Sequence, residues 1–196
     1  MIRKLLLGTA AAVLMSGQAM AAGLPGMRGV DHIGITVPDL KQAVDFFVNV
    51  LGCEAFFQLG PFKADNDWMQ VHLGVDPRAE IPVLQNVRCG YGANLEVFQY
   101  TAADQKTAYP KNSDVGGHHI ALYVDDMAAA VAHLKANGVR MLGEPTLMEQ
   151  GPSAGETWLY FLTPWGLQME LVSYPQGMAY EKDGPARMWS PKDPSK

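Results

Sequence analysis

The sequence predicts an α+β protein built from two paired βαβββ modules. Three observations support this: a repeated strand–helix segment, a glycine at a similar distance past each helix, and a glutamate in the last strand of each half. The stretch from Asp31, DHIGITVPDLKQAVDFFVNVLGCE, aligns with the stretch from His118, HHIALYVDDMAAAVAHLKANGVRM. One unit alone would leave a sheet face exposed, so a repeat of this size indicates two units that pack together.

The N-terminal segment has the build of a secretory signal peptide. A basic MIRK is followed by the apolar run LLLGTAAAVLM and by Ala19-Met20-Ala21, an A-x-A cleavage signal. We therefore expect residues 1–21 to be removed and the protein to be exported, to the periplasm. An uncleaved anchor or a buried N-terminal helix is the alternative. No other segment approaches the ~18 apolar residues of a membrane-spanning helix, so no membrane association is expected after cleavage.

The first module is expected at residues 27–105. A β-branched run from His32 predicts a strand, and Asp39 can cap the N-terminus of the helix that follows. In LKQAVDFFVNVL the apolar residues recur at 3–4 spacing, as on a buried helix face. Gly52 then allows a left-handed helix C-cap. Three strands are expected next, at residues 53–60, 81–89 and 93–100, with an insertion at 62–80 that can hold a short helix.

The second module is expected at residues 115–175 and follows the same order. A strand begins near His119, Asp126 caps a helix, and Gly138 ends it. Three further strands are expected at residues 140–145, 157–163 and 167–174. The polar segment 106–114, which contains Pro110, is predicted to link the modules, and residues 176–196 are expected to form an irregular tail.

Charge and cysteine content limit the function classes. The formal net charge of −5 argues against a nucleic-acid partner, which would need basic patches. The two cysteines, Cys53 and Cys89, fall in predicted strands of a chain that is large enough to be stable without a disulfide bond. Buried free thiols are therefore the expected state, although an exported protein can join them in a disulfide.

Four polar residues stand at matching places in the repeat. Glu96 and Glu170 each lie inside an otherwise apolar last strand, where a buried carboxylate without a partner is costly. The alignment pairs His32 with His119, which leaves His118 on the other face as a hydrogen-bonded, partly buried residue. Two imidazole nitrogens and two carboxylates are a ligand set for a divalent cation. The alternative is two surface glutamates and two capping histidines.

These motifs resemble those of the vicinal oxygen chelate superfamily, which has the glyoxalase/bleomycin resistance/dioxygenase fold. The similar segments are DHIGITV, DLKQAVDFFVNVLG, NLEVFQY, GHHIALYVDD and PWGLQMELVSYP. The resemblance covers about residues 29–175. It implies a cupped mixed sheet around one divalent metal ion (Ni, Zn, Co, Mn or Fe). The family's four ligand positions fall on His32, Glu96, His119 and Glu170.

The resemblance also implies a function. The full ligand set is similar to that of glyoxalases and epimerases, so we expect a metal-dependent lyase, isomerase or epimerase. It would act on a small hydroxy-carbonyl substrate through a stabilised enediolate, with Glu170 as main base and Glu96 as second proton carrier. Two alternatives are an extradiol-type dioxygenase and a non-catalytic binding protein of the bleomycin-resistance type. In the latter, Trp158, Tyr160 and Trp165 can line the cup.

Two further expectations concern substrate and assembly. Glyoxalase I-like sequences often carry an R-S-L-x-F-Y pattern in the first helix, whereas residues 41–47 read KQAVDFF. The arginine suited to a glutathione carboxylate is missing there, which argues against lactoylglutathione. The family forms its cup within one chain or between two, so the sequence leaves a homodimer open.

Overall fold

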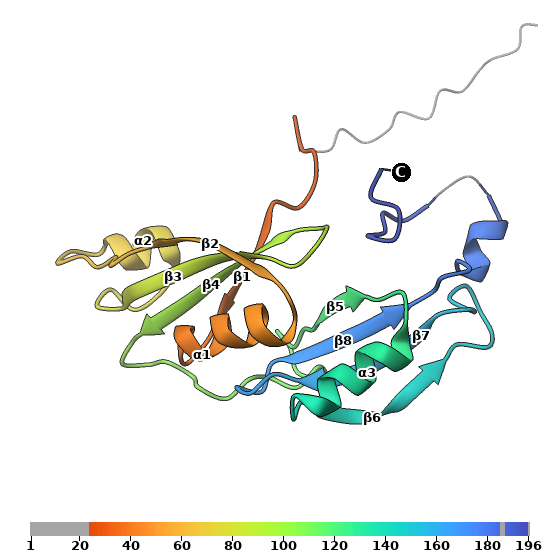
Figure 1. Ribbon diagram of the computed structural model, residues 1–196. Helices are drawn as coiled ribbons and strands as arrows, with labels where there is room; N and C mark the ends of the chain where they lie inside the picture. The colour runs from red at the N-terminus through yellow and green to blue at the C-terminus, as the bar shows by residue number, and fades with distance from the viewer. Residues whose placement is uncertain (1–23, 185–186, 196) are drawn as a thin grey trace, which may run out of the picture.

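The computed structural model describes residues 24–184 and 187–195. The expected signal peptide, residues 1–21, lies outside the described residues. The described residues form two four-stranded sheets, with strand orders β1-β4-β3-β2 and β5-β8-β7-β6 (Figure 1). In each sheet the first strand runs parallel to the last, and the other neighbours are antiparallel. This is the repeated α+β architecture that the sequence predicts.

The strand bounds follow the predicted runs closely. The first sheet contains β1 (His32–Thr36), β2 (Glu54–Leu59), β3 (Glu80–Arg88) and β4 (Asn94–Thr101). The second contains β5 (Ile120–Tyr123), β6 (Arg140–Leu147), β7 (Thr157–Leu162) and β8 (Gln168–Ser173). β1 and β5 are edge strands of their sheets.

The predicted helix caps are present. The Asp39 side chain accepts a hydrogen bond from the Gln42 N–H at the start of α1 (Leu40–Asp45). The Asp126 side chain accepts one from the Ala129 N–H at the start of α3 (Met127–Ala136). Gly52 and Gly138 both have φ near +70°, the left-handed conformation expected of glycines that end helices.

The first helix departs from the prediction in its second half. After α1 the chain continues as a π-helix, η1 (Phe46–Val50). A π-helical turn holds an extra residue and so shifts the side chains that follow around the axis. The adjacent residues Phe46 and Phe47 are consequently both buried. Their rings pack on Trp165 from the second module, each at 5.7 Å.

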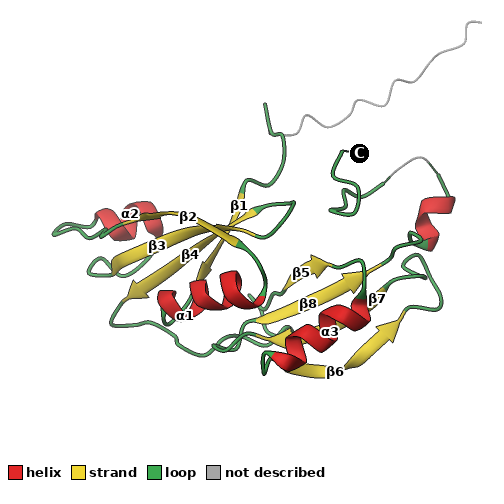
Figure 2. Ribbon diagram, in the orientation of Figure 1, coloured by secondary structure: helices red, strands yellow, loops and turns green. Residues whose placement is uncertain are grey.

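One hydrophobic core joins the two modules. It lies on the sheet faces that carry α1 and α3 (Figure 2). Ile35 and Val97 contribute to it from the first sheet, and Phe161 and Met169 from the second. His133 of α3 adds a polar contact, its Nε2 lying 2.8 Å from the Val50 carbonyl oxygen. The opposite faces of the two sheets carry the four predicted ligands.

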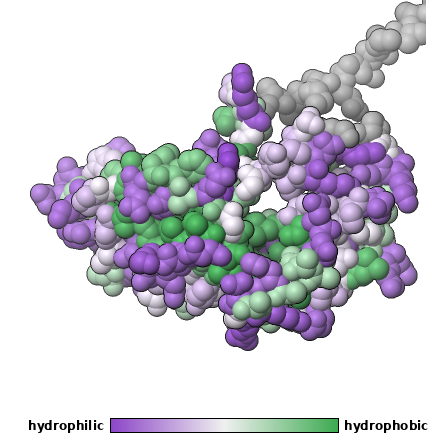
Figure 3. Space-filling view, in the orientation of Figure 1, coloured by the Kyte–Doolittle hydropathy of each residue, from purple (hydrophilic) through white to green (hydrophobic). Residues whose placement is uncertain are grey.

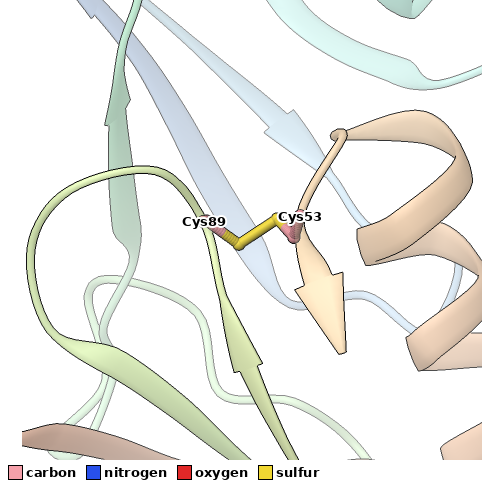
Figure 4. Close-up of a disulfide and its surroundings, with 2 residues drawn as sticks. All are labelled: Cys53 and Cys89. Atoms are coloured by element: carbon pink, nitrogen blue, oxygen red, sulfur yellow. A yellow bond between two sulfur atoms is a disulfide. The ribbon is translucent and has the colours of Figure 1, made fainter. Parts of the chain in front are cut away.

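The cysteines are bonded, which corrects the expectation of free thiols. Cys53 and Cys89 form a disulfide (Figure 4). The register of β2 and β3 pairs Glu54 with Arg88, so the residues just outside that pair face each other. Spacing along the chain could not show this, because 36 residues separate the two cysteines.

The insertion between β2 and β3 is a packed substructure. It contains α2 (Trp68–Leu73), which lies on the face of the first sheet opposite α1 (Figure 1). Met69 is fully buried there with Ile81 and Leu84, and Phe98 packs against this second small core.

The C-terminal tail contains the short 3₁₀-helix η2 (Ala179–Lys182) and is otherwise irregular. Two of its backbone N–H groups, those of Ala179 and Tyr180, bond carbonyls of the turn at residues 151–155. Within the described residues, no helix combines the length and the hydrophobicity needed to cross a membrane.

Candidate metal centre

The first half-site lies on the face of the first sheet that α1 does not cover. Alternation along β1 sends Ile33 and Ile35 away from it and leaves His32 on it. The parallel register with β4 brings Gly34 beside Glu96. His32 Nε2 therefore lies 3.5 Å from Glu96 Oε2.

Asp31 forms a hydrogen bond with the second ring nitrogen of His32, Nδ1. Its Oδ1 lies 2.8 Å from His32 Nδ1. This hydrogen bond is the main cause that raises the pKa of His32, and the Glu96 charge adds to it. When Nδ1–H donates to Asp31, the lone pair of Nε2 is available on the side of Glu96. A carboxylate behind a histidine is the usual support of a metal-binding imidazole.

The second half-site repeats the arrangement. His119 Nε2 lies 3.1 Å from Glu170 Oε2. Tyr160, paired with Glu170 across β7 and β8, places its ring edge-on to the imidazole at 5.1 Å. His119 Nδ1 lies 3.2 Å from the Asn112 side-chain amide, which can present its oxygen to an Nδ1–H if the amide turns over.

Glu170 is the more buried of the two glutamates. Its side chain is 12% exposed, against 22% for Glu96. Burial raises the pKa of Glu170, the charge of His119 lowers it, and the charge of Glu156 raises it. A carboxyl whose pKa moves up toward neutrality is a stronger base. This environment suits Glu170 to proton transfer.

The two pairs remain separate in one chain. Among the described residues, no group of three or more His, Cys, Asp or Glu side chains is close enough to hold a metal ion. The sequence predicts a single set of four. Within the described part of one chain these four residues form two half-sites, each offering one imidazole nitrogen and one carboxylate.

Other predicted residues are placed as follows. His118 lies near the carbonyl oxygen of Gly116, but it is exposed and not partly buried as expected. Trp158 and Tyr160 of β7 lie on the same face of the second sheet as Glu170 of β8. Trp165 packs in the core on the phenylalanines of η1.

Sequence reasoning missed three residues beside the half-sites. Asp31 and Asn112 contact the two histidines, and the negative charge of Glu156 raises the pKa of Glu170. The repeat could not reveal Asp31, because the position aligned with it in the second module is His118. Its signal was local: a carboxylate directly before a candidate ligand.

Known proteins resemble this chain over most of its length. A 2-epi-5-epi-valiolone epimerase from Actinomyces sp is 45% identical over 171 residues, which are 87% of this chain and 92% of that protein. An ethylmalonyl-CoA/methylmalonyl-CoA epimerase from Cereibacter sphaeroides is 31% identical over 62% of this chain and 81% of its own length. The crystal structure of SMU.1112c is 25% identical, with a TM-score of 0.51, and covers 74% of this chain and 98% of that one.

The family assignment follows from a further match. Residues 31–157 match the model of the glyoxalase/bleomycin resistance protein/dioxygenase superfamily. The similarity to epimerases indicates an enzyme of the isomerase type. The chain thus belongs to the glyoxalase/bleomycin resistance protein/dioxygenase superfamily, the vicinal oxygen chelate fold.

Proposed function

We propose that this protein is a metal-dependent epimerase of a small polyhydroxylated hydroxy-carbonyl compound, with its site completed between two copies of the chain. The observation that carries the proposal is the pair of matching half-sites, His32–Glu96 and His119–Glu170. The substrate class is supported by the relative named 2-epi-5-epi-valiolone epimerase, at 45% identity.

The donor set fits a divalent cation. Two half-sites together supply two imidazole nitrogens and two carboxylates, which balance a +2 charge and suit several transition metals. Each histidine has a polar neighbour at Nδ1, so each Nε2 can face the ion. A metal bound there would act as a Lewis acid toward adjacent oxygens of the substrate and favour the enediolate form.

The two carboxyl groups account for epimerisation. Glu170, with its raised pKa, removes the proton from the carbon next to the carbonyl. Glu96, on the opposing module, enters this step protonated and gives its proton to the opposite face of that carbon, after which proton exchange with solvent resets both carboxyl groups. One proton leaves and one arrives, so the composition of the substrate is unchanged and only the configuration inverts.

A second copy is proposed because each half-site lacks its counterpart. β1 and β5 are edge strands, and free edges pair readily with another chain. The first module also exposes apolar side chains on β2 and α2, namely Phe56, Phe57, Leu59, Trp68 and Val71. Figure 3 shows this hydrophobic surface on the part of the molecule that carries β2 and α2. Uncovered apolar surface of this kind favours association.

We also propose that the enzyme works after export. The Cys53–Cys89 disulfide supports an oxidising compartment, which agrees with the signal peptide expected in residues 1–21.

Mixing two complementary variants tests the shared site. One chain carries His32→Ala and Glu96→Ala, and the other carries His119→Ala and Glu170→Ala. If two copies build each site, a mixed dimer regains one complete ligand set and binds one metal ion. Metal content by mass spectrometry and epimerisation of 2-epi-5-epi-valiolone are the readouts.

The controls show whether regained metal binding requires two copies of the chain. Each variant alone is expected to bind no metal and to be inactive. A mixture that stays metal-free and inactive, beside a wild type with one metal per chain, would show that one chain holds all four ligands. His72→Ala changes an exposed histidine of α2 and is the matched control, expected to behave as wild type.

A further inference from the structure

The functional face of the first module extends beyond the half-site. Side chains of alternate residues share a face, so the face continues to Thr36 on β1 and to Tyr100 on β4. Four residues separate Glu96 from Tyr100, roughly 13 Å along a strand. A cavity of about 730 Å³ opens at this end, lined by Thr36, Tyr100 and residues of two flanking segments. These segments contribute Gln70 and Asp76 from the insertion, and Gln105 and Lys106 after β4.

The insertion is a preformed wall of this cavity. Its helix α2 is anchored by Met69, which is fully buried in the small core that also holds Leu84 and Phe98. The loop before α2 is tied down by Arg78, whose guanidinium donates to the carbonyls of Ala64 and Asn66 at 3.0 and 2.6 Å. The cavity therefore exists before any ligand arrives.

The second module is built differently at the equivalent place, where the C-terminal tail leaves a smaller cavity of about 280 Å³ beside Tyr174. Tyr123 lies four residues after His119, and Tyr174 lies four residues after Glu170. Thr36 and Tyr100 stand at the same distance after the predicted ligands of the first module. The two tyrosine rings contact each other at 4.9 Å. The tail then covers them, since Tyr174 Oη lies 2.7 Å from Ser190 Oγ. The completed site is thus asymmetric, because the larger cavity, of about 730 Å³, lies on the side of the first module.

The lining of the cavity indicates what it binds. Thr36 and Tyr100 supply hydroxyl groups, and Gln70 and Gln105 supply amides, so donors and acceptors are mixed. Two carboxylates, Asp76 and Asp104, outnumber the one lysine, Lys106. This balance disfavours the phosphates of an acyl-CoA. Sugar-like hydroxyl groups, each both donor and acceptor, match it.

We propose that this cavity is a second binding subsite for a neutral, hydroxyl-rich ring. One six-membered ring at the metal ligands does not reach it. A substrate that fills both places carries a second polyol ring, linked to the reacting one and held beside Gln70 and Tyr100. The identity of the reacting ring rests on the proposed function, whereas occupancy of the subsite is measured without turnover.

The test is sugar binding to the full-length mature protein, followed by NMR. The probes are the neutral disaccharides maltose, cellobiose and trehalose, with glucose and coenzyme A alongside. At least one disaccharide is expected to shift the backbone amides of residues 70–77 and 100–106. Gln70→Ala and Tyr100→Phe are expected to weaken that binding roughly fivefold to tenfold, as the loss of one hydrogen bond does.

Gln150→Ala alters an exposed glutamine of the turn beyond β6 and is expected to bind as wild type does. The proposal is overturned if no disaccharide shifts these amides, if the two subsite variants bind disaccharides as tightly as Gln150→Ala does, or if coenzyme A binds there instead. The NMR experiment measures binding without catalysis, so it can be interpreted even if the protein does not epimerise the test substrate. Equally, a lack of sugar binding says nothing against the epimerase activity.

Discussion

At the residue scale, Asp31 distinguishes the two half-sites. It accepts a hydrogen bond from His32 Nδ1, whereas His119 has an amide in that role. A charged acceptor makes the imidazole more basic and fixes the orientation of its ring. The first half-site is therefore the better prepared of the two to hold a cation.

Replacing Asp31 tests this directly. Asp31→Asn removes the largest cause of the raised pKa of His32, so this pKa is expected to fall. Metal affinity is expected to drop roughly tenfold to hundredfold, as when other outer-shell partners are removed. NMR titration of the metal-free protein gives the pKa, and chelator competition gives the affinity. Asp65→Asn, in an exposed loop, is the control. An affinity equal to that of the control would show that Asp31 does not support His32.

At the scale of elements, local sequence was sufficient to predict where the two helices begin and end. Asp39 and Asp126 cap helices, and Gly52 and Gly138 end them, because each effect depends on a few neighbouring residues. The π-helix η1 was not predicted, since the rings of Phe46 and Phe47 are buried by contact with Trp165, far away in the chain. The disulfide was missed for a related reason: it depends on the register of β2 against β3.

The disulfide is expected to stabilise the first module substantially. It closes a loop of 36 residues, for which the chain-entropy model gives about 4 kcal/mol. Cys89→Ser is expected to lose about that much free energy of unfolding, measured by urea denaturation. Reduced wild-type protein should unfold at the same urea concentration as the variant. An unchanged midpoint in the variant would mean that the bond contributes no stability to the protein.

At the scale of the whole molecule, the pairing of half-sites is decided by how the modules pack. The repeat identified all four candidate ligands, because each occupies a fixed position in its own module. It could not show whether they meet. That depends on contacts between modules, such as Trp165 on the phenylalanines of η1 and His133 at the Val50 carbonyl. These contacts join the helix-bearing faces and leave the two His–Glu pairs apart.

If two copies complete each other's sites, the free edges of β1 and β5 lie at the new interface. Their outward amides are then expected to exchange hydrogen slowly in concentrated protein and rapidly on dilution, while the central strands β4 and β8 stay protected at both concentrations. Added metal should raise the dimer fraction in sedimentation, because an ion bound by both copies stabilises the assembled state.

A metal-loaded protein that sediments as a monomer, with one ion per chain, would contradict this. The modules would then have to close on each other within one chain, breaking the contact between Trp165 and the phenylalanines of η1. Fluorescence of this half-buried tryptophan on metal addition separates the two cases, since assembly between copies leaves its surroundings intact.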